Sequence, residues 1–193
     1  MSRVPHLTPS EFTRAQAELY ALYATGPRAH PDSDFLLVDA RGQLIGPPAA
    51  WMLNAQLGLS LEHVGREIRF NLGLTPRIRE IVILIVAEAE DSDFERFAHE
   101  RAAAKAGLST DEVCAIADAT FASGDEKEGL AAELAAVLTS GQAITDGLWQ
   151  RATAQLGATA VFEIVTLVGY YRMMALQIKA FRLLPPSSRG PAC

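Results

Sequence analysis

The sequence has little cysteine and lacks the short motifs of several large enzyme classes. Cys114 and Cys193 are its two cysteines, and they form neither a metal-ligand spacing nor a C-x-x-C redox pair. The sequence contains no glycine-rich phosphate loop and no G-x-S-x-G nucleophile motif. These absences argue against a nucleotide-binding loop and a serine hydrolase, and a reducing cytoplasm is the expected compartment.

Basic residues are fewer than acidic ones and are scattered along the chain. The 17 Lys and Arg face 23 Asp and Glu, which gives a formal net charge of −6. A nucleic-acid-binding protein normally presents a basic face, so we expect no nucleic-acid partner. The N-terminus has no apolar run of the signal-peptide type, and Glu163 interrupts the apolar stretch that surrounds it. We therefore expect no membrane association.

Helix-capping sequences recur along the chain and predict an all-α fold. Hydrophobic residues make up 49% of the sequence and charged residues 21%, a globular composition that is slightly apolar for a monomer. We expect about nine helices and allow one short hairpin near residues 35–45, whereas no strand–helix alternation indicates a parallel sheet. The clearest start signals are Thr8-Pro9-Ser10-Glu11, Thr75-Pro76, Ser109-Thr110-Asp111-Glu112, Asp125 and Thr145, and a long final helix is expected over 158–184.

The stretch 76–107 is the most informative part of the sequence. It predicts two helices separated by a tight break at residues 91–93, and the first helix is almost wholly apolar from Ile81 to Ala87, so it should be buried on nearly every side. Glu95 and His99 are four residues apart and therefore share a face of the second helix. Such a pair is commonly a salt bridge on a solvated surface, but beside a buried helix it can also transfer a proton near neutral pH.

This stretch resembles the carboxymuconolactone decarboxylase family, which includes the alkylhydroperoxidase D-like proteins. The likeness covers about residues 44–182. It implies an orthogonal multi-helix bundle of the alkylhydroperoxidase D-like type that assembles as a homo-oligomer, a trimer or hexamer. We accordingly expect an N-terminal helix and arm over 1–43, a family domain over 44–184 and a disordered tail over 185–193. The matching residues are Gly46-Pro47, Ala50-Trp51-Met52-Leu53, Pro76-Arg77-x-Arg79-Glu80, Phe94-Glu95, His99, Ala103, Ala106-Gly107-Leu108-Ser109, Glu163-Ile164-Val165 and Gly169-Tyr170-Tyr171-Arg172-Met173.

The resemblance also assigns chemical roles. Redox members of the family carry C-x-x-C followed by a histidine, and here the two cysteine positions correspond to Ser92 and Glu95. Both thiols are absent, so thiol peroxidase chemistry is excluded in this stretch. The histidine is kept as His99, and the relay glutamate corresponds to Glu80. The chain departs from the family pattern at Pro48, Asn54-Ala55 and Arg96, which affects the expected shape of the pocket.

Decarboxylation of a lactone acid requires a positioned acid and a cation or hydrogen-bond donor near the developing negative charge. We expect His99 to be the proton donor or shuttle, oriented by Glu95 or Glu80. Arg77 or Arg79 would hold a substrate carboxylate. Trp51 and Tyr171 complete the expected substrate-binding set, with core packing as the alternative for both. No cofactor and no metal is required.

Two classes of function remain open. In the first, the chain is a cofactor-independent enzyme that acts by Glu/His proton transfer on a small carboxylic acid or lactone, through decarboxylation, isomerisation or cyclisation. In the second, it is a binding or assembly protein of the same fold. A sealed site, with Glu95 paired to Arg96 or Arg101 and no cavity at His99, would favour the second class. An apolar cavity that ends at His99 would favour the first.

Overall fold

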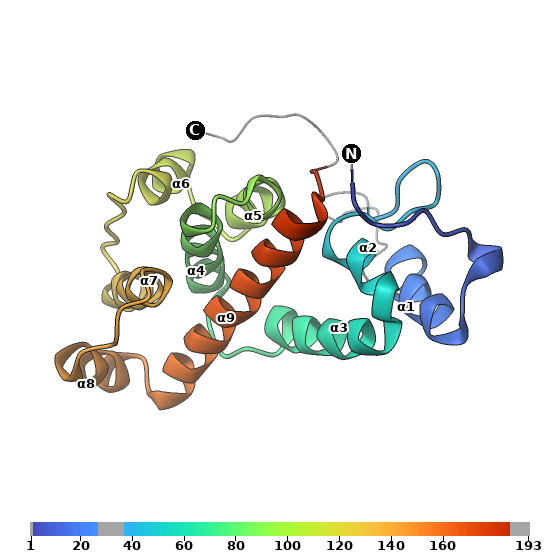
Figure 1. Ribbon diagram of the computed structural model, residues 1–193. Coiled ribbons are helices and arrows are strands. Elements are labelled where there is room, and N and C mark those ends of the chain that lie inside the picture. Colours follow the sequence, from blue (N-terminus) through green and yellow to red (C-terminus); the bar gives the residue numbers. More distant parts are fainter. Residues whose placement is uncertain (1, 27–36, 186–193) are drawn as a thin grey trace. The chain divides into compact units, whose positions relative to one another are not determined.

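The structure is a computed structural model that describes residues 2–26 and 37–185 (Figure 1). Within these residues it contains helices and one isolated β-bridge, which confirms the expected all-α fold class. Two 3-10 turns, η1 (Pro9–Glu11) and η3 (Met52–Asn54), accompany the α-helices. The α-helices are α1 (Arg14–Ala24), α2 (Pro47–Trp51), α3 (Ala55–Phe70), α4 (Pro76–Ala89), α5 (Asp93–Lys105), α6 (Thr110–Ala117), α7 (Glu126–Thr139), α8 (Asp146–Gln155) and α9 (Ala158–Phe181).

The described chain divides into two compact units. The first unit holds the described residues within 1–70 and 176–188, and the second holds those within 71–175. Helix α9 contributes its first 18 residues to the second unit and its last turns to the first.

In the first unit, α1 and α2 both pack against α3. Trp51 is buried, and its ring meets that of Tyr23 edge-on at 6.3 Å between centroids. The Trp51 indole N–H donates to Gln177 Oε1 at 2.7 Å. Gly58 of α3 faces this contact so closely that a Cβ there would lie 2.7 Å from the Cβ of Trp51. The absence of a side chain at Gly58 therefore allows α3 to approach Trp51.

The N-terminal helix begins later than its sequence suggests. Thr8 and Glu11 form the expected capping box, but it closes only the 3-10 turn η1. Phe12 then takes an extended conformation with ψ 132°, and its ring packs against Tyr20 at 5.2 Å between centroids. Thr13 provides a second cap, from which α1 starts at Arg14.

The segment near residues 35–45 contains a single antiparallel bridge between Val38 and Leu44, and residues 35 and 36 lie outside the described part. Asp39 N donates to Gln43 O at 2.8 Å across the turn. Gly42 has φ 77°, a left-handed conformation that glycine adopts without steric cost.

In the second unit, α4 packs against α5, α6 and α7 (Figure 1). Eight of its fourteen residues are buried, which confirms that this helix is enclosed on nearly every side. Buried hydrophobic residues of α4 form a core cluster with residues of α5, of α6 and of the loop before α6. The cluster comprises Ile81, Leu84, Ala103, Leu108, Val113 and Ile116.

Helix α9 is long and apolar enough, by length and composition, to cross a membrane. The core helix of a soluble protein passes the same test, so one such helix is weak evidence for a membrane protein. Glu163 of α9 accepts hydrogen bonds from Gly73 N at 3.0 and 3.1 Å. This charged residue thus has a defined backbone partner within the second unit.

Candidate active site

The break between α4 and α5 sets the geometry of the candidate site. Thr75 caps α4 by accepting from Ile78 N, and Ser92 caps α5 by accepting from Glu95 N. Between the helices, Asp91 takes a left-handed conformation with φ 49° that reverses the chain. Two helices joined by so short a connection must pack side by side, and this brings the early part of α4 against the middle of α5.

The packing of these helices joins Glu80, His99 and Glu95 into a buried triad. His99 Nδ1 lies 2.7 Å from Glu80 Oε2, and His99 Nε2 lies 3.6 Å from Glu95 Oε2. Glu80 is 2% exposed, Glu95 5% and His99 8%. The Glu95–His99 pair is therefore enclosed in the protein, not part of a solvated helix surface.

The pKa values of the two carboxyl groups of the triad are shifted in opposite directions. For Glu80, burial raises the pKa, but the charge and hydrogen bond of His99 and the contact with Arg79 outweigh it, so the pKa lies below its usual value. Burial raises the pKa of Glu95 to about 7, although His99 opposes the rise. One carboxyl is thus held ionised, while its neighbour exchanges a proton near neutral pH.

The positions of the protons follow from these contacts. An ionised Glu80 can only accept, so the Nδ1 proton of His99 is donated to it. In neutral His99 the second nitrogen, Nε2, is then an acceptor that faces the carboxyl of Glu95. The 3.6 Å separation exceeds a hydrogen bond, and catalytic contacts of this kind commonly shorten when a substrate binds.

Arg79 and Tyr171, two residues of the expected substrate-binding set, both contact the triad. Arg79 Nε donates to Glu80 Oε1 at 3.0 Å. The Tyr171 ring meets the His99 ring edge-on, with 5.0 Å between centroids and an interplanar angle of 88°. Tyr170 packs in turn against Tyr171 at 5.6 Å. These contacts restrict the orientation of the imidazole from the side of α9.

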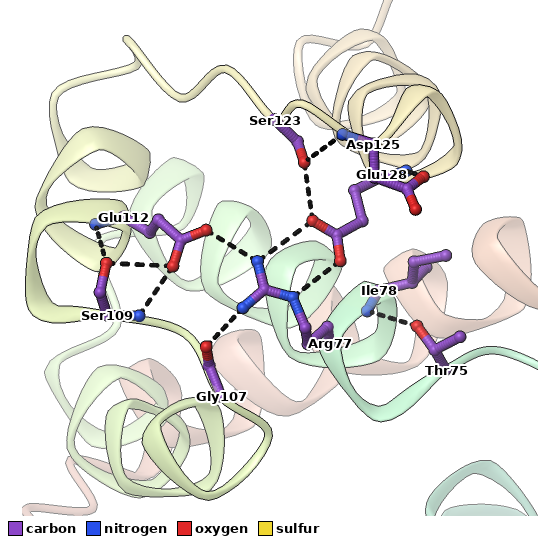
Figure 2. A network of polar contacts seen from close by, with 9 residues as sticks. All are labelled: Thr75, Arg77, Ile78, Gly107, Ser109, Glu112, Ser123, Asp125 and Glu128. Atoms are coloured by element: carbon purple, nitrogen blue, oxygen red, sulfur yellow. Dashed lines mark hydrogen bonds and ion pairs between the residues drawn. The ribbon is translucent and has the colours of Figure 1, made fainter.

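Arg77 lies in a different polar network, which Figure 2 shows. Its guanidinium donates to both carboxylate oxygens of Glu128, at 2.7 and 3.2 Å, and to Glu112 Oε1 at 2.7 Å. It also donates to the carbonyl oxygen of Gly107. Glu112 is the capping-box residue of α6, where it accepts from Ser109 N. Arg77 therefore links α4 to the start of α6 and to α7, and these contacts occupy most of its donors.

The two arginines of α5 that might have sealed the site have other contacts. Arg96 pairs with Glu88 at 2.9 Å, with Asp91 at 3.2 Å and with Asp93 at 2.6 Å. The guanidinium carbon of Arg101 lies 4.4 Å from the centre of the Phe97 ring. Arg96, a residue that differs from the family pattern, thus neutralises acidic residues at the turn between α4 and α5.

Trp51 belongs to the first unit, where it is a buried packing residue bonded to Gln177.

Among residues 2–26 and 37–185, no group of three or more His, Cys, Asp or Glu side chains is arranged to hold a metal ion. The packing of Tyr171 against His99 could not be predicted from the sequence, because the two residues lie 72 positions apart and no local pattern indicates their contact.

The fold and the triad together define an all-α protein with a buried carboxylate–histidine–carboxylate site. The model of the Carboxymuconolactone decarboxylase family matches residues 57–137, which include all three residues of the triad. This match confirms the resemblance seen in the sequence, and it supports a carboxymuconolactone decarboxylase-like or alkylhydroperoxidase D-like function at the level of the family. A search of curated proteins found no match to the chain.

Proposed function

We propose that the chain is a cofactor-independent enzyme that transfers protons to and from a small carboxylic acid or lactone, with decarboxylation as its reaction. The observation that carries the proposal is the pair of buried carboxyl groups on either side of His99, one with a lowered pKa and the other with a pKa of about 7. Pairs of carboxyls whose environments separate their pKa values are typical of acid–base sites.

Glu95 and His99 would handle the proton. When the bond to the departing carboxylate breaks, CO₂ leaves and its electron pair moves into the conjugated system toward the lactone carbonyl. The resulting dienolate takes a proton at carbon. Glu95, partly protonated at neutral pH, would donate this proton, and His99 Nε2 would relay its replacement. Glu80 would hold the imidazole in the required tautomer.

Arg79 is the cation that we assign to a substrate carboxylate, because it already contacts the triad through Glu80. Arg77 was an equal candidate in the sequence, but its contacts with Glu112, Glu128 and Gly107 favour a structural role. Tyr171 would form one wall of the substrate site, beside the His99 ring.

The residues of the α4–α5 break favour proton transfer over thiol chemistry. Ser92 and Glu95 stand where redox relatives carry their cysteines, and Ser92 is engaged in capping α5. Neither side chain can form the disulfide on which those relatives depend. Isomerisation or cyclisation of the same substrate class would use the same proton relay, so the products must distinguish these reactions from decarboxylation.

We also propose that the protein forms a homo-oligomer. In the second unit, Phe162 and Val165 of α9 are 70% and 41% exposed, although both are large apolar residues. Size-exclusion chromatography with light scattering should give the mass of a trimer or a hexamer. A monomer at micromolar concentration would contradict this part of the proposal.

The enzymatic proposal is tested by incubating the purified protein with carboxymuconolactone and measuring CO₂ release. His99→Ala should lower turnover by about 10²–10⁴-fold, the range for loss of a general acid–base group. His63→Ala is the matched control, because His63 is also a helical histidine but is exposed and bonded to Arg66. Its turnover should equal that of the wild type.

Each other outcome would overturn a different part of the proposal. If the wild type consumes the lactone without releasing CO₂, and His99→Ala does not, the protein is an isomerase or cyclase. If the wild type releases CO₂ and His99→Ala does so equally fast, the relay is wrong. If the wild type leaves the lactone unchanged, this substrate is excluded.

A further inference from the structure

The first unit contains a pocket to which the triad contributes no residue. Its volume is about 390 Å³, within the range of small-molecule sites. The N-terminal arm, the turn around Gly42, the start of α2 and the segment that follows α9 form its walls. Residues from three separate regions of the sequence, 2–20, 39–52 and 182–184, thus converge on one concave surface.

Hydrogen bonds hold the arm on both sides of the pocket. On one side, Arg3 N donates to Phe181 O at 2.9 Å and Arg3 Nη1 to Ala180 O at 3.0 Å. On the other, the side-chain amide of Gln43 accepts from Leu7 N at 3.3 Å and donates to Leu7 O at 2.6 Å. The arm between these attachments is held in place, and a preformed site loses less entropy when a ligand binds.

The pocket combines an apolar interior with few charged groups. The charged residues in its lining are Asp39 and Arg182, and His6 and Tyr20 are its other titratable residues. Asp39 is engaged in the turn, where its Oδ1 accepts from Arg41 N and Gln43 N. The apolar lining includes Val4, Leu7, Phe12, Ile45, Met52 and Leu183.

Arg182 is the distinctive residue of this lining. It is exposed, and among the residues that the structure describes no carboxylate pairs with its guanidinium. Its backbone has φ 51°, and Leu183 N bonds to Ile178 O at 3.0 Å, the arrangement of a helix C-terminal cap in which glycine is the usual residue. Within the described residues, a cation without a carboxylate partner thus lies beside an apolar pocket, at a backbone position that disfavours side chains.

We propose that this pocket binds a small carboxylate with an apolar body, of the size of a medium-chain fatty acid. The apolar body would fill the interior, and the carboxylate would pair with Arg182. His6 would add a weaker attraction, since Glu11 lies close enough to interact with it. The proposal concerns a ligand of the first unit and does not depend on the reaction of the triad.

Isothermal titration calorimetry with octanoate tests the proposal on the full chain, and 1-octanol serves as the uncharged probe. We expect saturable binding of octanoate. Arg182→Gln should weaken octanoate by about tenfold and leave 1-octanol unchanged, because only the ion pair is lost. Arg41→Gln is the matched control, since Arg41 is an exposed arginine of the neighbouring turn that does not line the pocket, and it should bind octanoate as the wild type does.

Ala49→Phe probes the site itself, because half-buried Ala49 of α2 lines the pocket and a phenyl ring there would fill it. Octanoate affinity should fall at least tenfold, with circular dichroism showing an unchanged helical content; Ala49→Leu replaces it if the larger variant does not fold. Absence of saturable octanoate binding would overturn the proposal. Equal affinity of Arg182→Gln and wild type, or unchanged binding in the filled variant, would do the same.

Discussion

Replacing Glu95 with glutamine should stabilise the protein above neutral pH and leave its stability nearly unchanged in mild acid. Glutamine has almost the shape of a protonated glutamate but cannot ionise. The folded protein resists ionisation of Glu95 because burial raises its pKa from 4.5 to about 7. Glutamine removes this free-energy cost of ionisation without opening a cavity.

The magnitude follows from the two pKa values. Below about pH 4.5 the carboxyl is protonated in both the folded and the unfolded chain, so its ionisation does not change the free energy of unfolding. Between 4.5 and about 7 the unfolded chain ionises while the folded chain stays protonated, and this difference favours unfolding. Above pH 7 the accumulated penalty amounts to about 3 kcal/mol, at about 1.4 kcal/mol for each pKa unit. Above pH 7 the free energy of unfolding of Glu95→Gln should therefore exceed that of the wild type by up to about 3 kcal/mol.

Glu80→Gln is the matched control and should have the opposite sign. The pKa of Glu80 is lowered by His99 and Arg79 in spite of burial, so its ionised form stabilises the fold above the unfolded pKa and this contribution is lost as the pH falls through the folded pKa. At neutral pH, loss of its charged hydrogen bonds should cost about 2 kcal/mol.

Urea unfolding at about pH 5 and about pH 8.5, followed by circular dichroism, measures both effects as free energies of unfolding. The increase in the free energy of unfolding of Glu95→Gln over the wild type should be large at the higher pH and small at the lower one. If the wild type and Glu95→Gln differ by the same amount at both values, Glu95 does not titrate near neutrality and the reasoning fails.

Three further predictions concern the polar network, the packing of the first unit and the relay. Arg77→Met should lower the free energy of unfolding by about 2–4 kcal/mol, because it leaves Glu112 and Glu128 without their cation; a loss below about 0.5 kcal/mol in urea unfolding would contradict this. Hydrogen bonding to Arg77 lowers the pKa of Glu112 to about 2, so the network's stability should be lost as the pH falls through that value, and acid unfolding of Arg77→Met should lack this component. Gly58→Ala should lower the thermal midpoint, because its Cβ would lie 2.7 Å from the Trp51 Cβ, whereas Gly129→Ala, with no atom within 4 Å, should gain about 0.5–1 kcal/mol from helix propensity; equal shifts would refute the packing argument. In the CO₂ assay, His99→Ala should lose turnover.

The sequence was most informative where local signals decide the structure. Pro76 follows a capping threonine, and α4 begins there as expected. Helix periodicity also placed Glu95 and His99 on one face, and the apolar run of α4 indicated burial around them. The start of α1 shows the limit of such signals, because packing of Phe12 against Tyr20 accompanies an extended residue directly after a complete capping box.

Contacts between distant residues were much harder to predict. Arg77 meets Glu112 and Glu128, which lie 35 and 51 residues further along the chain, so no local pattern reveals that its donors are occupied. The contact of Glu80 with His99, 19 residues away, was anticipated through the family resemblance alone. The pocket beside Arg182 could not be inferred for the same reason, because its walls come from three separate regions of the sequence.

The proposed chemistry depends on Glu95 exchanging a proton near neutral pH beside His99. The most direct test is a ¹³C NMR titration of the protein labelled at the glutamate δ-carboxyl carbons, with the Glu95 signal assigned by its absence from Glu95→Gln. We expect that signal to titrate with a midpoint of about 7. A midpoint near the ordinary value of 4.5 would contradict it, and Glu95 would then be an ionised structural partner of His99.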